Sequence, residues 1–337
     1  YGNGKTITTD ANGNRTVYEY DGEYRTTAIR YPDGTVTKRV YQNGWMVKET
    51  DRAGVEMTFT YDSRGNITKK EGAGIITRYA YDGKNHLTAV TDACGSTTRA
   101  EYDSAGNLTK LTDGEGNVNA FVYDGRNRLI KQIDANGNVL TYSYSGSYLT
   151  ETRVNGRITG RFAYDAMGQP VSCRDGAGNT TVYTYDLLSR NTSVKQPEGG
   201  AVTISYKKTG LVESIRDARG GITAYTYDKG NNITSVTDAC GSRYEYTYDA
   251  NENRLSEKDP EGNVTAYSYD AMDRLVKQTD ALGGVYAYAY DNHDNIISIT
   301  DPLKNKQRLT YDAYYGQLLS HTDEEGIRTE FTYDSVG

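Results

Sequence analysis

The 337-residue sequence has few of the residues from which disulfide scaffolds, metal sites and membrane spans are built. It holds 3 cysteines and 3 histidines, and it has no run of 18 apolar residues. Cysteines in a small, odd number argue against a disulfide scaffold, and a bridge between Cys94 and Cys240 would need two distant turns to lie within disulfide reach. His86, His293 and His321 are scattered along the chain, whereas a metal ion needs converging ligands. The sequence therefore predicts no metal, no cofactor and no membrane span.

The chain also has no excess of positive charge, and proline is rare. The chain has 38 Lys and Arg against 45 Asp and Glu, so its surface does not suit nucleic acid. With only 5 prolines and no Ser/Gly-rich stretch, it shows no linker, and no signal peptide is visible. Hydrophobic residues make up 36%, but 32 tyrosines can bury large ring areas. A core would therefore be built from aromatic rings.

What the chain has instead is a repeat. Tyrosine recurs at sixteen positions separated by 20 or 21 residues, and once by 22, and thirteen of these tyrosines precede Asp. These anchor tyrosines are Tyr20, Tyr41, Tyr61, Tyr81, Tyr102, Tyr123, Tyr144, Tyr164, Tyr185, Tyr206, Tyr227, Tyr248, Tyr269, Tyr290, Tyr311 and Tyr333. The period predicts that residues 1–337 form a single continuous array of about sixteen stacked repeats, which we expect to be a piece of a longer protein.

Two runs rich in Thr, Val, Ile and Tyr predict two strands in each repeat. The first run follows the anchor, for example at 66–70, 107–111, 128–133, 232–237 and 274–279. The second run ends at the next anchor, for example at 117–123, 138–144, 179–185 and 263–269. All 4 phenylalanines, and many tyrosines, stand two residues before an anchor. Since successive side chains of a strand point to opposite faces, one face of the predicted sheet is an aromatic ladder.

The turns between these strands are marked by Asp with Gly three residues later. Asp bonds its own downstream backbone, and Gly adopts the left-handed angles that close the turn. The clearest pairs are Asp113 with Gly116, Asp134 with Gly137, and Asp175 with Gly178. We interpret these turn residues and the anchor tyrosines as structural, and we expect no catalytic residue.

Other interpretations of the same residues are weaker. Calcium-binding β-solenoids carry a Gly-Gly-x-Gly-x-Asp nonapeptide that is absent here. A catalytic carboxylate pair would be expected as a break in the repeat, and none stands out. The aromatic ladder could stack on sugars, but a long exposed aromatic strip would favour aggregation, so packing is the better interpretation.

The repeat resembles the YD repeat of RHS-repeat proteins. The resemblance rests on Tyr-Asp-x-x-Gly-Asn-(Leu/Ile), at 61–67 and 102–108, followed by Asp-x-x-Gly-Asn at 113–117, and it covers essentially the whole chain. It implies an all-β fold in which tandem hairpins of about 21 residues form a long antiparallel sheet that spirals into a hollow shell or β-solenoid. In bacterial RHS proteins and the C component of insecticidal toxin complexes, such a shell encloses a toxic C-terminal domain. The self-cleaving segment that ends those shells is not recognisable here.

The resemblance implies a non-catalytic shell segment of a secreted RHS-type toxin. Its expected partners are an enclosed C-terminal toxin domain of the same polyprotein and the secretion or delivery machinery. The alternative is a cell-surface adhesion or carbohydrate-binding repeat region, as in wall-associated YD-repeat proteins and teneurins, with surface glycans as partners. Both alternatives place the protein outside the cell or on its surface.

Overall fold

A computed structural model describes residues 4–333 of the chain. These residues form thirty-two β-strands and no helix, and the strands belong to one sheet. The chain divides into two compact units. Unit 1 comprises residues 1–80, 91–95 and 244–337, and unit 2 comprises residues 81–90 and 96–243. Within the described range, no apolar helix is available to cross a bilayer.

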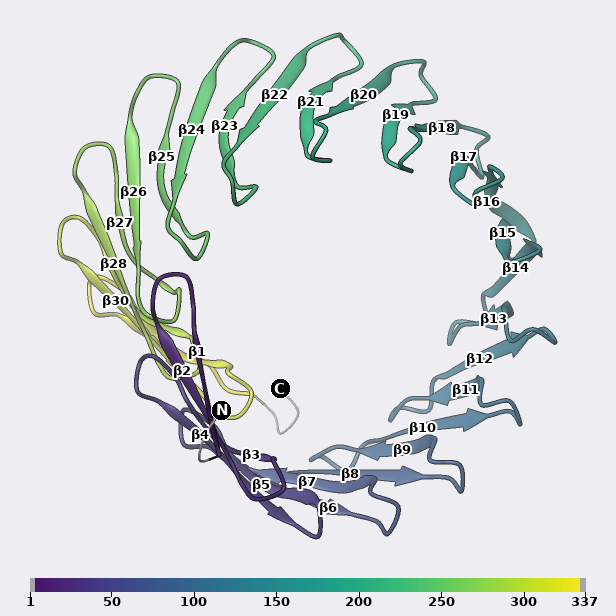
Figure 1. Cartoon of the computed structure of the whole chain (residues 1–337). Helices are drawn as coiled ribbons and strands as arrows, with labels where there is room; N and C mark the ends of the chain where they lie inside the picture. Colours follow the sequence, from purple (N-terminus) through teal and green to yellow (C-terminus); the bar gives the residue numbers. More distant parts are fainter. Residues whose placement is uncertain (1–3, 334–337) are drawn as a thin grey trace. The chain divides into compact units, whose positions relative to one another are not determined.

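Unit 1 contains the first eight strands and the last nine, which follow one another as hairpins (Figure 1). They are β1 (Lys5–Thr9), β2 (Arg15–Tyr20), β3 (Thr26–Arg30), β4 (Val36–Gln42), β5 (Trp45–Thr50), β6 (Glu56–Tyr61), β7 (Ile67–Gly72), β8 (Ile75–Tyr81), β24 (Arg243–Tyr248), β25 (Arg254–Lys258), β26 (Val264–Tyr269), β27 (Leu275–Thr279), β28 (Val285–Tyr290), β29 (Ile296–Thr300), β30 (Lys306–Tyr311), β31 (Leu318–Thr322) and β32 (Arg328–Glu330). Each strand pairs antiparallel with the next in the chain within these two groups.

Unit 2 is the middle of the array and repeats the same hairpin. Its strands are β9 (Leu87–Thr91), β10 (Thr97–Tyr102), β11 (Leu108–Thr112), β12 (Val118–Tyr123), β13 (Leu129–Ile133), β14 (Val139–Ser145), β15 (Tyr148–Val154), β16 (Arg157–Tyr164), β17 (Pro170–Asp175), β18 (Thr180–Tyr185), β19 (Asn191–Lys195), β20 (Ala201–Tyr206), β21 (Val212–Arg216), β22 (Ile222–Tyr227) and β23 (Ile233–Thr237). Consecutive strands again pair antiparallel. The prediction of an all-β array of tandem hairpins is confirmed.

Antiparallel pairing separates the two kinds of turn. Since each strand reverses the direction of the one before, the turns after the anchor tyrosines lie at one end of the strands and the Asp-x-x-Gly turns at the other. We call these two sides of the sheet the Tyr-Asp rim and the Asp-Gly rim. The two rims therefore carry different side chains.

A β-bulge precedes each anchor tyrosine in most of the hairpins. In the β12–β13 pair, Val122 faces Lys131 but Tyr123 faces Leu129, so one residue of β13 is skipped. The same shift occurs at Tyr102, Tyr185, Tyr227 and Tyr269. A bulge bends the strand and re-aims the side chain beside it. Each anchor side chain is thus set at an angle that an unbroken ladder would not give.

Burial follows the predicted alternation along the second strand of each repeat. In β18, Tyr183 and Tyr185 are half-buried and Thr184 between them is exposed. Full burial is rare. Among the described residues, Ala28 is the one buried hydrophobic residue. The aromatic ladder is therefore a half-covered surface stabilised by contacts between neighbouring repeats.

The first strand of each repeat begins one residue later than the sequence predicts. Prediction placed Asn107 and Arg128 at strand starts, whereas β11 begins at Leu108 and β13 at Leu129. The difference arises because Asn107 and Arg128 close the preceding turn, where their side chains bind the turn aspartate. Where an Asp-x-x-Gly turn is missing, at Asn155 and Gly156, both residues have positive φ and form a two-residue hairpin turn.

Candidate functional site

The Asp-x-x-Gly turns are held by the aspartate carboxylate. In the turn at Asp134, one carboxylate oxygen accepts the backbone N–H of Asn136 at 2.9 Å and of Asn138 at 2.8 Å. The other accepts the side-chain amide of Asn138 at 2.8 Å, and this bond, followed by the backbone N–H of Asn138, lowers the pKa of Asp134. Gly137 closes the turn with φ of 81°.

The other two predicted turns have the same geometry. Asp113 accepts the backbone N–H and the side-chain amide of Asn117, both at 2.8 Å. Asp175 accepts the corresponding groups of Asn179, both at 2.9 Å. The side-chain amide and then the backbone N–H lower the pKa of each aspartate. Gly116 and Gly178 stand in the same closing position as Gly137.

The Tyr-Asp turns use a similar arrangement with a wider choice of residues. At Asp124, the Arg128 guanidinium replaces the asparagine amide and donates to the carboxylate at 2.7 Å. This bond is the largest cause that lowers the pKa of Asp124 to about 2. Asn127 closes the turn with φ of 59°, because asparagine tolerates the left-handed region better than most residues.

Hydroxyls of many anchor tyrosines bond a backbone carbonyl of the repeat before. Tyr102 donates to the carbonyl of Leu87 at 2.9 Å, and Tyr290 to that of Leu275 at 2.7 Å. The same bond, always to the residue fifteen positions back, is made by Tyr41, Tyr61, Tyr144, Tyr185, Tyr206, Tyr227, Tyr269 and Tyr333. Tyr81, Tyr123, Tyr164, Tyr248 and Tyr311 hold the equivalent strand-end position. We call this bond, together with the ring contact below, the tyrosine latch.

The ring of an anchor tyrosine is covered by a flat side chain from the turn before it. Arg190 lies 4.5 Å from the ring centre of Tyr206, and Arg128 lies 4.6 Å from that of Tyr144. In other repeats the covering group is aromatic, at Trp45–Tyr61, His86–Tyr102 and Tyr148–Tyr164. Arginine over a tyrosine face is attracted by the negative π surface. The latch therefore combines a ring contact with a backbone hydrogen bond.

Sequence reasoning identified the anchor tyrosines but missed the covering residues. The available signal was the position five residues after an anchor, where Asn, Arg and His alternate, as at Asn107, Arg128 and His86. All three have flat polar groups that can bond the turn aspartate, and arginine and histidine can also lie over the next ring. Burial raises the pKa of Tyr144 and Tyr227, consistent with their partly covered positions.

A second kind of contact joins distant repeats within unit 1. The Tyr-Asp rim of the late repeats lies against the Asp-Gly rim of the early repeats, and residues 237 to 242 positions apart bond to one another. Asn12 donates its backbone N–H to the Asn251 side chain at 3.0 Å and its amide to Asp249 at 2.9 Å. Asn251 in turn donates to Asp10 at 2.9 Å. We call this the rim contact.

Charged side chains continue the rim contact two repeats along. Arg52 is only 13% exposed, and its guanidinium bonds both carboxylate oxygens of Asp294 at 3.1 Å and Asp33 at 3.2 Å. His293 Nε2 lies 2.8 Å from Asp51 Oδ2. Burial opposes ionisation of Asp51, but the bond from His293 together with the backbone N–H bonds from Val55 and Ala53 outweighs it, and the pKa is lowered. Sequence reasoning did not identify this contact of His293.

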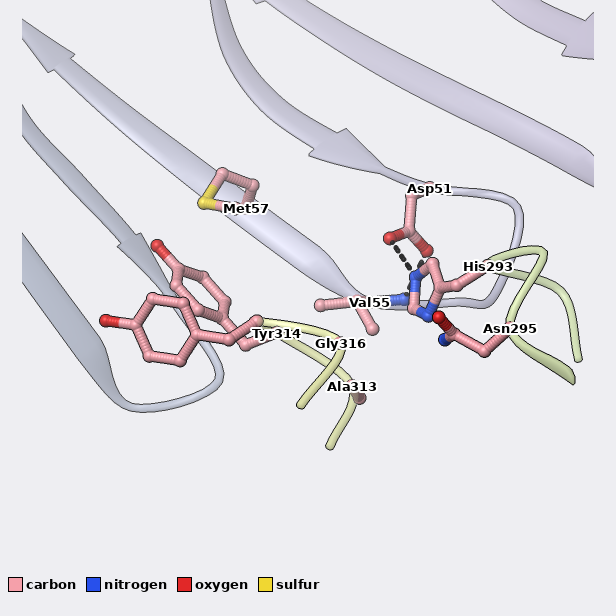
Figure 2. A pocket seen from close by; sticks show the side chains of 9 residues that line it. Asp51, Val55, Met57, His293, Asn295, Ala313, Tyr314 and Gly316 are labelled. Atoms are coloured by element: carbon pink, nitrogen blue, oxygen red, sulfur yellow. Dashed lines mark hydrogen bonds and ion pairs between the residues drawn. The ribbon is translucent and has the colours of Figure 1, made fainter. Parts of the chain in front are cut away.

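A pocket of about 360 Å³ lies beside these charges (Figure 2). Figure 2 shows His293 facing Asp51, with Tyr314 on the other side near Met57. Gly72 leaves room for the Tyr314 ring, because a Cβ at position 72 would lie 3.1 Å from a ring carbon. The lining residues include no Ser, Thr, Cys or Lys that could act as a nucleophile. The pocket combines aromatic and acidic groups.

Histidines and cysteines lie apart from one another in the described part of the chain. No group of three or more His, Cys, Asp or Glu side chains there is placed to hold a metal ion. The cysteines at 94, 173 and 240 are thiols. His86 lies against Asp82 and His321 against Gln307, so the histidines do not converge.

Two family models and a set of solved structures match the chain. The Teneurin YD-shell model matches residues 37–209, and the RHS Repeat model matches residues 2–36, 206–243, 231–264, 248–285 and 273–306. None of the curated proteins matches. The TcdB2-TccC3 crystal structure aligns with 97% of the chain at 18% identity and a TM-score of 0.82. TcdB2-TccC3 without its hypervariable C-terminal region aligns with 92% at 19% identity and a TM-score of 0.80.

These structural matches share the fold with this chain. The chain spans only 22% and 19% of the two matched chains, respectively.

Proposed function

The chain belongs to the teneurin YD-shell family of RHS-repeat proteins, and we propose that it is a non-catalytic wall segment of a secreted toxin shell. In this proposal the wall encloses a C-terminal toxin domain of the same polyprotein and keeps it apart from its targets until delivery. The partners are that enclosed domain and the machinery that delivers it. The segment acts outside the producing cell or at its surface.

The recurrence of the tyrosine latch is the observation that carries the proposal. The same hydroxyl-to-carbonyl bond recurs from Tyr41 to Tyr333, in both units. An active site is one cluster of residues that differs from the rest of a chain, whereas here the same hydroxyl-to-carbonyl bond recurs in many repeats. Each latch fixes one hairpin to the next, so the repeats form a stiff, continuous wall.

Containment requires that the wall resist opening between hairpins. Backbone ladders hold neighbouring strands together, and the latches add a side-chain bond and a ring contact across the same junction. Each side-chain hydrogen bond contributes about 1 kcal/mol, and the contributions add along an array. The wall is therefore stabilised at many junctions along the chain rather than at a single closure point.

The test is made on the full-length parent protein. Intact mass spectrometry beside size-exclusion chromatography would find a C-terminal fragment that is cut from the chain yet co-elutes with the repeats. An uncut protein with no domain beyond the repeats would contradict encapsulation and favour surface adhesion.

The pocket in the rim contact favours glycan binding as a second candidate function. Tyr314, Tyr315, Asn295 and Asp51 offer aromatic faces and hydrogen-bonding groups of the kind that sugars use. On a glycan array, binding that is lost in Tyr314→Ala but kept in Tyr24→Ala, an exposed tyrosine outside the pocket, would support adhesion. The wall proposal expects no glycan to bind.

A further inference from the structure

Unit 2 exposes apolar side chains at turn tips whose counterparts in the late repeats of unit 1 are half-buried. Met167 and Leu188 stand three residues after an anchor, on the Tyr-Asp rim, and both are 71% exposed. Met272 and His293 hold the equivalent position in unit 1 and are half-buried. His293 owes this to the rim contact. Leu187, beside Leu188, is 99% exposed as well, and a contiguous group of exposed apolar side chains is typical of a surface that binds a partner.

The Asp-Gly rim of unit 1 has an exposed apolar pair of its own. Leu282 and Leu303 stand two residues after a turn aspartate and are 97% and 82% exposed. Other repeats carry polar or small residues at this position, including Asn12, Ala53, Glu115, Asn136, Ala177, Arg219, Glu261 and Glu325. Leucine is thus confined to two consecutive repeats of this rim.

The rim contact in unit 1 defines which positions meet. Asn251, three residues after its anchor, meets Asn12, which stands two residues after its turn aspartate. Two repeats along, His293 meets Asp51, so the late and early repeats run in the same direction and advance one for one. A third-position residue of a Tyr-Asp rim therefore faces the second-position region of an Asp-Gly rim.

The same rule pairs the two exposed apolar patches. Met167 and Leu188 are one repeat of 21 residues apart, and so are Leu282 and Leu303. Placing Met167 on Leu282 places Leu188 on Leu303. One repeat further, the same register brings the turn with Lys208 opposite the turn with Glu325, while the neighbouring Lys207 lies over the ring of Tyr227. Two apolar pairs and one pair of opposite charges therefore agree in a single register.

We propose that a second copy of this chain docks edge to edge through these rims. The Tyr-Asp rim of one copy, at Met167 and Leu188, packs on the Asp-Gly rim of the other, at Leu282 and Leu303. The contact is heterologous, because different surfaces meet, and each copy keeps one unused rim. The expected products are dimers that extend into longer stacks at high concentration.

The experiment compares three forms of the 337-residue chain by sedimentation velocity. The unchanged chain is expected to self-associate below about 100 µM, the range of a weak but specific interface. Variant one carries Met167→Asp and Leu188→Asp, and variant two carries Leu282→Asp and Leu303→Asp. Each variant alone should associate about tenfold or more weakly, because a carboxylate would be buried in the contact.

Mixing the two variants gives the decisive result. Each keeps one intact rim, so the mixture should form a one-to-one dimer that grows no further. A matched control, Glu115→Lys, changes a tip of the Asp-Gly rim that has no partner in this register and should leave association unchanged. The substituted tips are exposed, and circular dichroism would verify that every variant is folded.

Three outcomes would overturn the proposal. The unchanged chain could remain a monomer over this range, or the mixture could fail to restore a dimer. Association that survives Leu282→Asp and Leu303→Asp but not the other pair would show that the Tyr-Asp rim binds a different surface.

Discussion

Unit 1 and unit 2 are built from the same repeat, but unit 1 has a second set of contacts. In unit 2, the latches join neighbouring repeats, as Tyr206 does with Asn191. Unit 1 has the same latches and, in addition, bonds between residues about 240 positions apart, such as Arg52 and Asp294. Stability in unit 2 is therefore a sum of local terms, whereas unit 1 couples repeats that are distant in sequence.

The largest expected effect comes from removing one latch in each unit. Tyr206→Ala and Tyr290→Ala are matched, since each ring lies under an arginine and each hydroxyl bonds a carbonyl at 2.7 Å. Each loss should cost about 3 kcal/mol of local stability, as for other large-to-small changes at packed rings. In Tyr206→Ala, amide hydrogen exchange should accelerate only in the strands near Tyr206. In Tyr290→Ala, it should accelerate in the strands near Tyr290 and also at the Asp51 turn, which contacts the turn after Tyr290. An equal spread in both units would contradict the comparison.

Arg52→Ala tests the rim contact alone. It removes two ion pairs of a guanidinium that is only 13% exposed, at a cost of about 2 kcal/mol, between the values for exposed and buried pairs. Urea unfolding followed by exchange in unit 1 would measure the loss, while unit 2 should keep its protection. Arg126→Ala, at an exposed turn of unit 2, is the matched control and should change little.

Acid should produce the smallest difference. Asp124 has a pKa lowered to about 2 from 3.8, so its contribution is complete above pH 3.8 and is lost as the pH falls toward 2. Asp124→Asn should reduce the acid dependence of urea unfolding in unit 2. In unit 1, protonation of Asp51 also breaks its bond to His293. Because the pKa of Asp51 is lowered from 3.8, the rim contact of unit 1 should open as the pH falls below 3.8. A rim contact that persists after Asp51 is protonated would contradict this prediction.

Strands and turns could be predicted from the sequence because their causes are local. Asp134 and its partner Asn138 are four residues apart, so the pattern that encodes the turn is visible in a short window. The aromatic alternation that predicts the sheet face extends over three residues, as in Tyr183 to Tyr185.

The rim contact could not be predicted, because no short window contains both of its sides. Arg52 and Asp294 are 242 positions apart, far beyond the range over which a local sequence pattern extends. The covering residues were missed for a different reason. Arg128 and His86 cover the next anchor ring, but the same position carries Asn107 in another repeat, and these three residues differ in size and charge, so the sequence shows no common pattern there.

The fifteen-residue reach of the latch gives the array a direction during synthesis. Each hydroxyl bonds a carbonyl that precedes it in the chain, so the carbonyl of Leu275 is synthesised fifteen residues before the hydroxyl of Tyr290 that bonds it. On a ribosome, chains are made at roughly 5–20 residues per second, so every repeat spends about one to three seconds without its latch. The acceptor of a latch is therefore always synthesised before the tyrosine that bonds it.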